Sequence, residues 1–288
     1  MRIHVAIATT GRPSILRQVV DHLALQERQP DGIVVVGAAR EDIASLDADD
    51  NGLDILLSER GLCKQRNAAL RHIGKGSDVV VFIDDDFVAA RDFLRRVELL
   101  FRYRPEVVGA TGILVADGAH TSPLEFDVAV QRLDVLGERP PPRLFECRSL
   151  YGCNMAIRLS AAEGMRFDER LPLYGWQEDV DFTYQLGWRG TLVKTSELTG
   201  IHLGSRSGKT SGVRLGYSQV ANIAYLLRKG TIHGTTGRTL MMRNVTANVV
   251  RSLWPEPDVD RRGRLTGNLL AARDVLRGRI DPERIEAL

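Results

Sequence analysis

The chain has 288 residues, of which 43% are hydrophobic and 26% are charged, and it contains 27 glycines. This length can bury a sizeable core, and the composition is that of a soluble globular protein, which excludes collagen, coiled coil and intrinsic disorder. An odd number of cysteines without metal-ligand spacing predicts neither a disulfide framework nor structural zinc, and it indicates a reducing compartment. The three cysteines are Cys63, Cys147 and Cys153.

The formal net charge of +2 is unevenly divided along the chain. Residues 213–288 hold 13 Lys and Arg against 7 Asp and Glu, a net charge of +6, which leaves −4 for residues 1–212. No apolar run reaches the length of a membrane-spanning helix, and the first residues do not have the pattern of a signal peptide. We therefore expect a cytoplasmic protein with an acidic body and a basic C-terminal region.

Short apolar strands alternate with amphipathic helices in the first third of the chain. Strands are predicted at 3–8, 33–36, 53–57 and 79–83, and helices from Pro13 and over 62–72. This alternation is typical of an α/β fold with a mostly parallel sheet covered on both faces by helices. Ligands of such sheets bind at the carboxyl ends of the strands, where the three aspartates Asp84, Asp85 and Asp86 follow the strand VVVFI.

The pattern is weaker in the middle of the chain and becomes helical at the end. A helix is predicted at 91–103, a strand at 107–115, an irregular connection or short hairpin at 117–147, a strand at 148–157 and a helix at 178–188. The polar segment Gly204–Gly212 is predicted to be a loop. Three helices are then expected at about 213–229, 235–252 and 263–278.

Asp84, Asp85 and Asp86 form the first candidate site. Three adjacent carboxylates repel one another, and a bound divalent cation such as Mg²⁺ or Mn²⁺ removes that cost. A solvated acidic turn is the alternative interpretation, but the position at the end of a buried strand favours a metal site.

A second acidic group, Glu178, Asp179 and Asp181, opens a predicted helix. The helix dipole alone favours acids in a first turn. Tyr174 and Trp176 lie just before them, however, and aromatic faces beside carboxylates are a common way of holding sugar rings. We interpret the segment as a site that holds a sugar ring, with the acids bonded to its hydroxyls.

His202 and the loop after it complete the list of candidates. A single histidine is either structural or a ligand, and both interpretations remain open from the residues alone. The loop sequence GSRSGKT resembles a P-loop. Gly204 and Gly208 enclose three residues, however, where a P-loop has four, and the segment comes after the strands of the sheet instead of before them. Both differences argue against a P-loop kinase or ATPase. Arg206 and Lys209 are candidates for holding phosphates.

Four motifs together resemble the family 2 glycosyltransferases with the GT-A fold, which are inverting, metal-dependent enzymes that use nucleotide-sugar donors. The motifs are VAIATTGRP, GLCKQRNAAL, VVVFIDDDF, and YGCNMAIR followed by FDERLPLYGWQEDVDFTYQLGWRG. The resemblance covers roughly residues 1–205. It implies a nucleotide-sugar-binding half at 1–110 and an acceptor-binding and catalytic half at 111–212. The charge division and the predicted helices add a basic helical extension at 213–288.

The resemblance also implies roles for individual residues. Asp179 would be the general base beside Glu178, while Trp176 and Tyr174 would bind the acceptor. Metal ligands would be Asp84, Asp86 and His202. Nucleotide and donor binding would fall to Thr9, Arg12, Arg66, Asp84, Asp85, Gly152, Asn154, Arg206 and Lys209.

The implied reaction moves a sugar from a nucleoside-diphosphate donor, UDP-sugar above all, to a hydroxyl of a glycan or lipid-linked glycan, with Mn²⁺ or Mg²⁺ as cofactor. Family members often carry an Asp just after the second strand, where this chain has Gly37 and Ala38. The usual carboxylate is either missing or replaced by Glu41 or Asp42, so the identity of the nucleotide base stays open.

The basic region 213–288 has two interpretations. It either packs on the body or mediates a homodimer, or it attaches the protein to an anionic membrane surface at the inner face of the cell membrane. No recognition motif supports nucleic-acid binding. Two further functions compete with a transferase: a sugar-nucleotide pyrophosphorylase, for which TTGRP is too short an activating loop, and a non-catalytic glycan-assembly subunit, which the intact acidic motifs disfavour.

Overall fold

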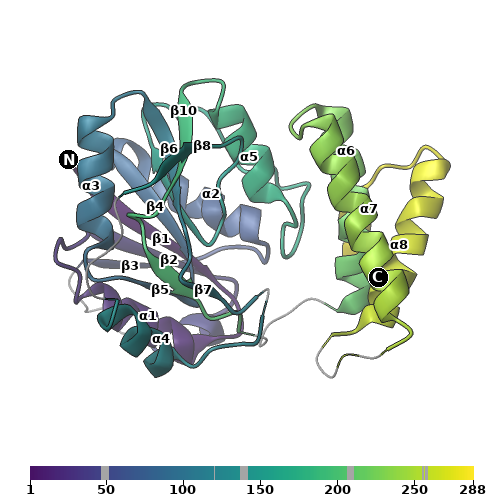
Figure 1. Ribbon diagram of the computed structural model, residues 1–288, viewed down its shortest axis with the longest axis horizontal. Helices are drawn as coiled ribbons and strands as arrows, with labels where there is room; N and C mark the ends of the chain where they lie inside the picture. Colours follow the sequence, from purple (N-terminus) through teal and green to yellow (C-terminus); the bar gives the residue numbers. More distant parts are fainter. Residues whose placement is uncertain (47–51, 120, 137–141, 206–210, 255, 257–258) are drawn as a thin grey trace. The chain divides into compact units, whose positions relative to one another are not determined.

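The computed structural model describes the chain except for residues 47–51, 120, 137–141, 206–210, 255 and 257–258 (Figure 1). The chain forms two compact units. Unit 1 comprises Met1–Arg60, Lys64–Arg166 and Gln185–Gly208, and unit 2 comprises Gly61–Cys63, Phe167–Tyr184 and Lys209–Leu288. The three-part division expected from the sequence stays a prediction.

An eight-stranded sheet is the centre of the described part of unit 1, in the order β3-β2-β1-β4-β9-β6-β10-β8. The strands are β1 (Ile3–Thr9), β2 (Gly32–Gly37), β3 (Leu53–Leu57), β4 (Val79–Asp84), β6 (Val107–Gly112), β8 (Leu144–Glu146), β9 (Asn154–Arg158) and β10 (Thr191–Thr195). The first four are mutually parallel, as predicted. In the other half β9 runs antiparallel to both of its neighbours, and β8 is antiparallel to β10. The expected α/β class is confirmed, with a mixed sheet.

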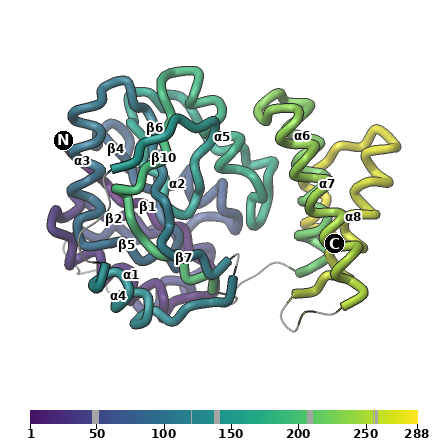
Figure 2. Tube along the Cα trace, in the orientation of Figure 1, coloured from purple at the N-terminus to yellow at the C-terminus, as the bar shows by residue number. Residues whose placement is uncertain are grey.

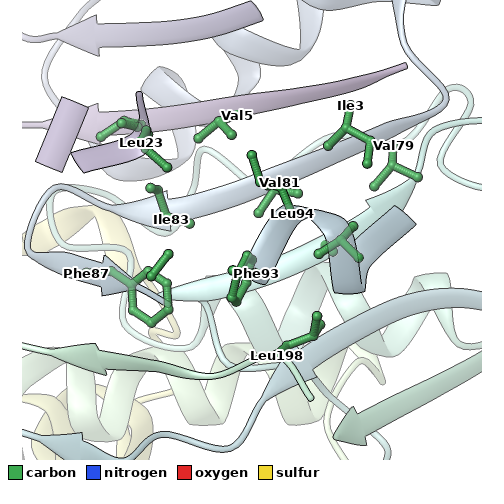
Figure 3. Close-up of a cluster of buried hydrophobic side chains, with 14 of the residues drawn as sticks. Ile3, Val5, Leu23, Val79, Val81, Ile83, Phe87, Phe93, Leu94 and Leu198 are labelled. Carbon is green, nitrogen blue, oxygen red and sulfur yellow. The ribbon is translucent and has the colours of Figure 1, made fainter. Parts of the chain in front are cut away.

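Alternating side chains of the buried strands face two different layers of helices. The first helices are α1 (Pro13–Leu23), α2 (Leu62–Ile73) and α3 (Phe93–Tyr103), with short 3-10 turns at Arg40–Ile43 and Gly74–Gly76. Val81 and Ile83 of β4 pack in one core with Leu23 of α1 and Phe93 of α3 (Figure 3). Phe82 points the other way, where Arg66 of α2 lies over its ring. Because successive strand residues point to opposite faces, both faces of β4 are buried.

A small second sheet extends unit 1 beyond the ends of the main strands. It contains β5 (Phe87–Ala89), β11 (Gly200–His202) and β7 (Ala116–Asp117), with β11 in the middle. His202 pairs with Phe87 across the antiparallel side and with Asp117 across the parallel side. The pairing therefore brings three segments that are distant in the sequence to one place.

The expected irregular connection or hairpin at 117–147 is wrong in one part, because α4 (Phe126–Asp134) is a helix. Its apolar side chains, spaced three, four and seven residues apart, pack against Val88 and Ile201 of the small sheet. They are Phe126, Ala129, Val130 and Leu133. A nine-residue helix gives only two turns of pattern, which explains why the sequence signal was missed.

Other strand boundaries differ from the predicted ones by several residues. The strand expected at 148–157 begins at Asn154, and β6 ends at Gly112 instead of residue 115. The sequence did not predict β5, β10 or β11, which are short or partly polar. Helix α5 (Glu178–Leu186) occurs where it was expected.

Three long helices form the C-terminal part of unit 2: α6 (Gly212–Lys229), α7 (Gly234–Arg251) and α8 (Arg261–Leu276), followed by a 3-10 turn at Pro282–Ala287 (Figures 1 and 2). The three predicted helices are thus confirmed to within two residues at each end. A core around Tyr217, Val220 and Ala271 joins α6 to α8. Of the helices in the described residues, none is long and apolar enough to cross a membrane.

Two glycines and several buried side-chain amides fix how these three helices pack. A side chain at Gly216 would collide with the backbone of Arg264, and one at Gly267 with the backbone of Val213, so glycine permits the contact of α6 and α8. Asn248 of α7 donates hydrogen bonds to Gln219 of α6 (2.8 Å) and to Asn268 of α8 (2.9 Å). Buried polar groups that bond one another specify a single arrangement of the helices.

Candidate functional site

Asp84, Asp85 and Asp86 of unit 1 lie at the carboxyl end of β4, beside the end of β1. Ala8 pairs with Asp84 in parallel register, so Thr9 and the aspartates meet at one edge of the sheet. Asp84 is the last residue of β4, and Asp85 and Asp86 form the turn into β5. The predicted position of the three carboxylates is therefore observed.

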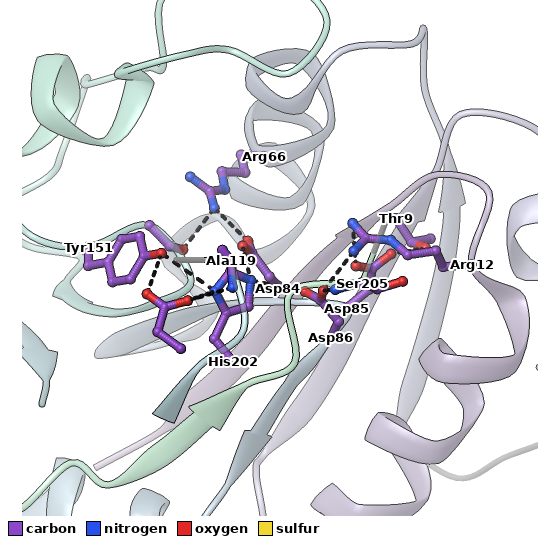
Figure 4. A network of polar contacts seen from close by, with 12 residues as sticks. Thr9, Arg12, Arg66, Asp84, Asp85, Asp86, Ala119, Tyr151, His202 and Ser205 are labelled. Atoms are coloured by element: carbon purple, nitrogen blue, oxygen red, sulfur yellow. Dashed lines mark hydrogen bonds and ion pairs between the residues drawn. The ribbon is translucent and has the colours of Figure 1, made fainter. Parts of the chain in front are cut away.

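Asp85 is fully buried and held by two residues that follow β1. The Thr9 hydroxyl donates to Asp85 Oδ2 at 2.6 Å, and the Arg12 guanidinium lies 2.8 Å from Asp85 Oδ1 and 2.9 Å from Asp86 Oδ2 (Figure 4). Burial raises the pKa of Asp85 above its usual range, against the opposing effect of the Arg12 charge. The structure thus places Thr9 and Arg12 on the aspartates, where they fix the turn.

Asp84, Asp86 and His202, which we call the metal-ligand cluster, bring one ligand atom each to within 4.8 Å of one another. His202 Nε2 lies 3.3 Å from Asp86 Oδ1 and 3.8 Å from Asp84 Oδ2 (Figure 4). Two carboxylates and one imidazole are a donor set that fits a divalent cation such as Mn²⁺ or Mg²⁺. The three residues that were expected to be metal ligands therefore lie together, and their chemistry fits a divalent ion.

His202 is oriented from its other side by Asp117 and Tyr151. Its Nδ1 lies 3.0 Å from Asp117 Oδ1, and the Tyr151 hydroxyl donates to Asp117 Oδ2 at 3.1 Å. Burial alone would lower the pKa of His202, but Asp117 and Asp86 raise it to about 10. A proton on Nδ1 shared with Asp117 leaves Nε2 facing Asp84 and Asp86, the orientation that a metal-binding histidine needs.

Sequence reasoning missed Asp117 and Tyr151. Asp117 lies in the segment without a clear period, and only its register beside His202 in the small sheet shows its place. Tyr151 begins the quoted motif YGCNMAIR, but no spacing rule linked it to the histidine.

Arg66, Gly152 and Asn154 lie near Asp84 in different ways. Arg66 is buried on α2, donates to Gly152 O at 2.8 Å and lies 3.2 Å from Asp84 Oδ1. Asn154 is fully buried in β9, where its Oδ1 accepts hydrogen bonds from the Thr111 hydroxyl and from the Gly112 amide. Arg66 is thus beside the acidic edge, whereas the Asn154 side chain ties two strands together.

The sequence offered Asp42 as a substitute for the acid after the second strand. Its carboxylate accepts backbone N–H bonds from Gly11 (2.6 Å), Ala38 (3.0 Å) and Ala39 (2.9 Å). Because these amides follow β1 and β2, Asp42 connects the ends of the two strands. The oxygens of the Asp42 carboxylate thus accept hydrogen bonds from backbone amides of unit 1.

Unit 2 contains the second acidic group, at the start of α5. Leu173 and Gln177, neither of them glycine, have left-handed φ angles of 55° and 72°, a strained conformation that surrounding contacts must maintain. Tyr174 and Trp176 stack with ring centroids 6.4 Å apart, and Tyr174 is exposed. The Asp179 carboxylate accepts the Val180 amide at 2.8 Å. Glu178 beside it is buried.

The segment 173–181 is supported by α6 and by the residues after it. Lys229 Nζ lies 2.8 Å from the fully buried Asp181 Oδ2 and 2.7 Å from Asp168, and the Thr231 hydroxyl donates to Asp181. Asn222 of α6 donates to Trp176 O at 2.9 Å. The positions of Trp176 and of the first turn of α5 thus depend on the C-terminal helices.

Arg206 and Lys209 lie outside the residues that the structure describes. Ser205, the last described residue before them, donates its amide to Asp86 Oδ2 at 2.7 Å.

No protein-family model and no curated protein sequence matches this chain. Solved glycosyltransferase structures do. The S. aureus TarS fragment 1–349 in complex with UDP-GlcNAc superposes with a TM-score of 0.59 at 15% identity, over 100% of this chain and 84% of that one. The chain has the GT-A fold.

Two further structures agree with this fold. A longer TarS structure matches over 100% of this chain with a TM-score of 0.58 and 17% identity, and the chain spans only 50% of its length. The mannosyltransferase PcManGT from Pyrobaculum calidifontis, in complex with GDP-Man and Mn²⁺, matches over 99% of this chain and 85% of its own, with a TM-score of 0.51 and 17% identity.

Proposed function

We propose that the chain is a metal-dependent inverting glycosyltransferase of the family 2 type, which moves a sugar from a UDP-sugar to a hydroxyl of a glycan or lipid-linked glycan. The observation that carries this proposal is the metal-ligand cluster at the carboxyl edge of the sheet in a GT-A fold. Glycosyltransferases of this fold were solved with UDP-GlcNAc and with GDP-Man and Mn²⁺, which supports a nucleoside-diphosphate donor and a divalent cation.

Asp84, Asp86 and His202 would hold Mn²⁺ or Mg²⁺. Such an ion, when bound, stabilises the negative charge that develops on the leaving diphosphate. Asp117 keeps His202 Nε2 directed at the two aspartates, and Arg12 keeps Asp86 in place. The protein's contribution is a preformed donor set that needs little rearrangement.

Donor binding is assigned to residues around this edge. Arg66 brings a cation beside Asp84, and Gly152 positions that guanidinium through its carbonyl. Thr9, Arg12, Asp85 and Asn154 act by shaping the edge, since their side chains contact other protein groups. Arg206 and Lys209 remain proposed phosphate ligands because both are cationic and follow Ser205, whose amide already contacts Asp86.

Asp179 is proposed as the general base, with Glu178 beside it. Asp179 takes the proton of the acceptor hydroxyl while the oxygen forms a bond to the anomeric carbon. The bond from that carbon to the diphosphate breaks on the opposite face, and its electron pair leaves with the nucleotide. Attack from the opposite face inverts the anomeric configuration. Tyr174 and Trp176 offer aromatic faces for the acceptor sugar.

The test is sugar transfer by the purified full chain with UDP, GDP and dTDP sugars. EDTA should abolish transfer, and Mn²⁺ or Mg²⁺ should restore it. Asp179→Asn should lower the turnover roughly 10² to 10⁴-fold and leave donor binding nearly unchanged, because base catalysis is worth about that much. Full activity in EDTA would show that the reaction needs no divalent metal. Normal turnover by Asp179→Asn would show that Asp179 is not the general base.

The same assay separates the competing functions. Formation of a nucleotide-sugar from a sugar phosphate and a nucleoside triphosphate would identify a pyrophosphorylase. Donor binding without transfer or donor hydrolysis would identify a non-catalytic subunit.

A further inference from the structure

Helix α7 carries a row of exposed apolar side chains that the core of unit 2 does not use. Met242 is 66% exposed, and Leu253 and Trp254, just beyond the end of the helix, are each 70% exposed. Val249 and Val250 lie between them and are also exposed. Val249 and Val250, seven and eight residues after Met242, lie on the same side of the helix as Met242, and Leu253 and Trp254 follow the end of the helix. We call these five residues the outer row.

The opposite side of α7 provides the packing. Gly237 and Asn248 are buried, and Met241 and Val245 pack against the core around Tyr217. Unit 2 therefore has its core on one side of α7, and the outer row adds apolar surface that folding does not require.

Every charged residue of α6 and α7 is basic. Between Val213 and Pro255 the sequence has six Lys and Arg and no Asp or Glu. Arg238, one helical turn before Met242, and Arg243, next to it, are exposed and make no ion pair among the described residues. Arg251 is paired with Glu256 at 3.1 Å. The surface is thus apolar and cationic at once.

This combination limits the possible occupants. In a two-fold contact between copies of the chain, the same cationic surface would lie on both sides of the contact, and like charges would oppose association. A polyanion such as nucleic acid would use the arginines but would have no need for Met242 and Leu253. An anionic bilayer uses both, since its headgroups attract the arginines and its interface accepts Leu, Met and Trp side chains.

We propose that the outer row of α7, with Arg238 and Arg243, binds the surface of a bilayer that contains anionic lipid. The helix lies along that surface. This binding does not depend on the glycosyltransferase activity, so its test is independent of the reaction.

The experiment measures partition of the full chain onto phosphatidylcholine vesicles with and without phosphatidylglycerol. Binding is expected only with phosphatidylglycerol and should weaken as salt rises. Leu253→Ser with Trp254→Ser should lower the partition coefficient at least about tenfold, because loss of buried apolar groups removes interfacial affinity. Arg238→Gln and Arg243→Gln should each lower it about fivefold.

Matched controls lie in unit 1. Trp188 is 72% exposed, like Trp254, so Trp188→Ser should leave partition unchanged, and Arg132→Gln should do the same. All these side chains are exposed, so the melting temperature should not change.

Three results would overturn the proposal. The first is no binding to anionic vesicles. The second is equal loss with Trp188→Ser and Trp254→Ser. The third is a dimer in solution that Leu253→Ser dissociates while vesicle binding is unchanged, which would assign the row to a second copy.

Discussion

Two acidic groups, one in each unit, are built in a similar way. Asp85 in unit 1 and Asp181 in unit 2 are both fully buried and both pair with a basic side chain, Arg12 and Lys229 respectively. Each also accepts a hydrogen bond from a threonine hydroxyl. Next to each buried carboxylate are the acids proposed for chemistry. In both groups, then, one aspartate is held by buried side-chain contacts, and its neighbours are the residues proposed for metal binding or for base catalysis.

The two groups differ in where their support comes from. Arg12 follows the strand that pairs directly with β4, so the support of Asp85 arises within the sheet. Lys229 is the last residue of α6, 48 residues after Asp181, and the support of α5 comes from the C-terminal helices. The basic region 213–288 therefore has a structural task in unit 2 beyond any surface that it presents.

The largest expected effect tests a proposed metal ligand of the first group. Asp86→Asn should lower Mn²⁺ affinity at least about 100-fold, because it removes a charged ligand of the metal-ligand cluster. Isothermal titration with Mn²⁺ in the absence of donor measures this directly. Asp127→Asn, an exposed aspartate on α4, is the matched control and should bind Mn²⁺ normally. Unchanged affinity in Asp86→Asn would contradict the proposed site.

The next effect tests the support of the second group. Lys229→Met leaves Asp181 buried without its cation and should lower the free energy of unfolding by about 3 kcal/mol, measured by urea denaturation. Burial already raises the pKa of Asp181. Without Lys229 that pKa rises further, so the deficit should be largest at neutral pH and should shrink as acid protonates the carboxyl.

The control for that pair is Lys75→Met. Lys75 is 92% exposed and lies 3.1 Å from Glu163, so its loss should leave the unfolding curve unchanged, as exposed pairs contribute little. A deficit in Lys229→Met that is no larger than in Lys75→Met would show that the C-terminal helices do not stabilise α5 through this pair.

The comparison also shows what a sequence reveals about such sites. The acidic turn was predictable, since VVVFIDDDF joins a fully apolar strand to three carboxylates and parallel sheets bind ligands at that edge. Long helices with a sustained period, such as α6 and α8, were predictable too. Asp117 and Lys229 were not, because their partners are set by strand register and helix packing over 85 and 48 residues, which no local pattern encodes.

The smallest expected effect concerns Asp117, the residue that the sequence did not reveal. Asp117→Asn keeps the size of the side chain but removes the charge that holds His202 Nδ1–H, so Mn²⁺ affinity should fall about 10 to 100-fold, less than in Asp86→Asn. The chain offers a matched control in Asp54, which lies 2.8 Å from His72 Nε2 in an exposed pair. Asp54→Asn alters a carboxylate–imidazole pair of the same type and should leave Mn²⁺ titrations unchanged. If Asp117→Asn bound Mn²⁺ as tightly as Asp54→Asn, Asp117 would serve only the packing of the small sheet. An intermediate affinity, with a normal melting temperature, would show that orientation of His202 contributes to the site separately from the ligands themselves.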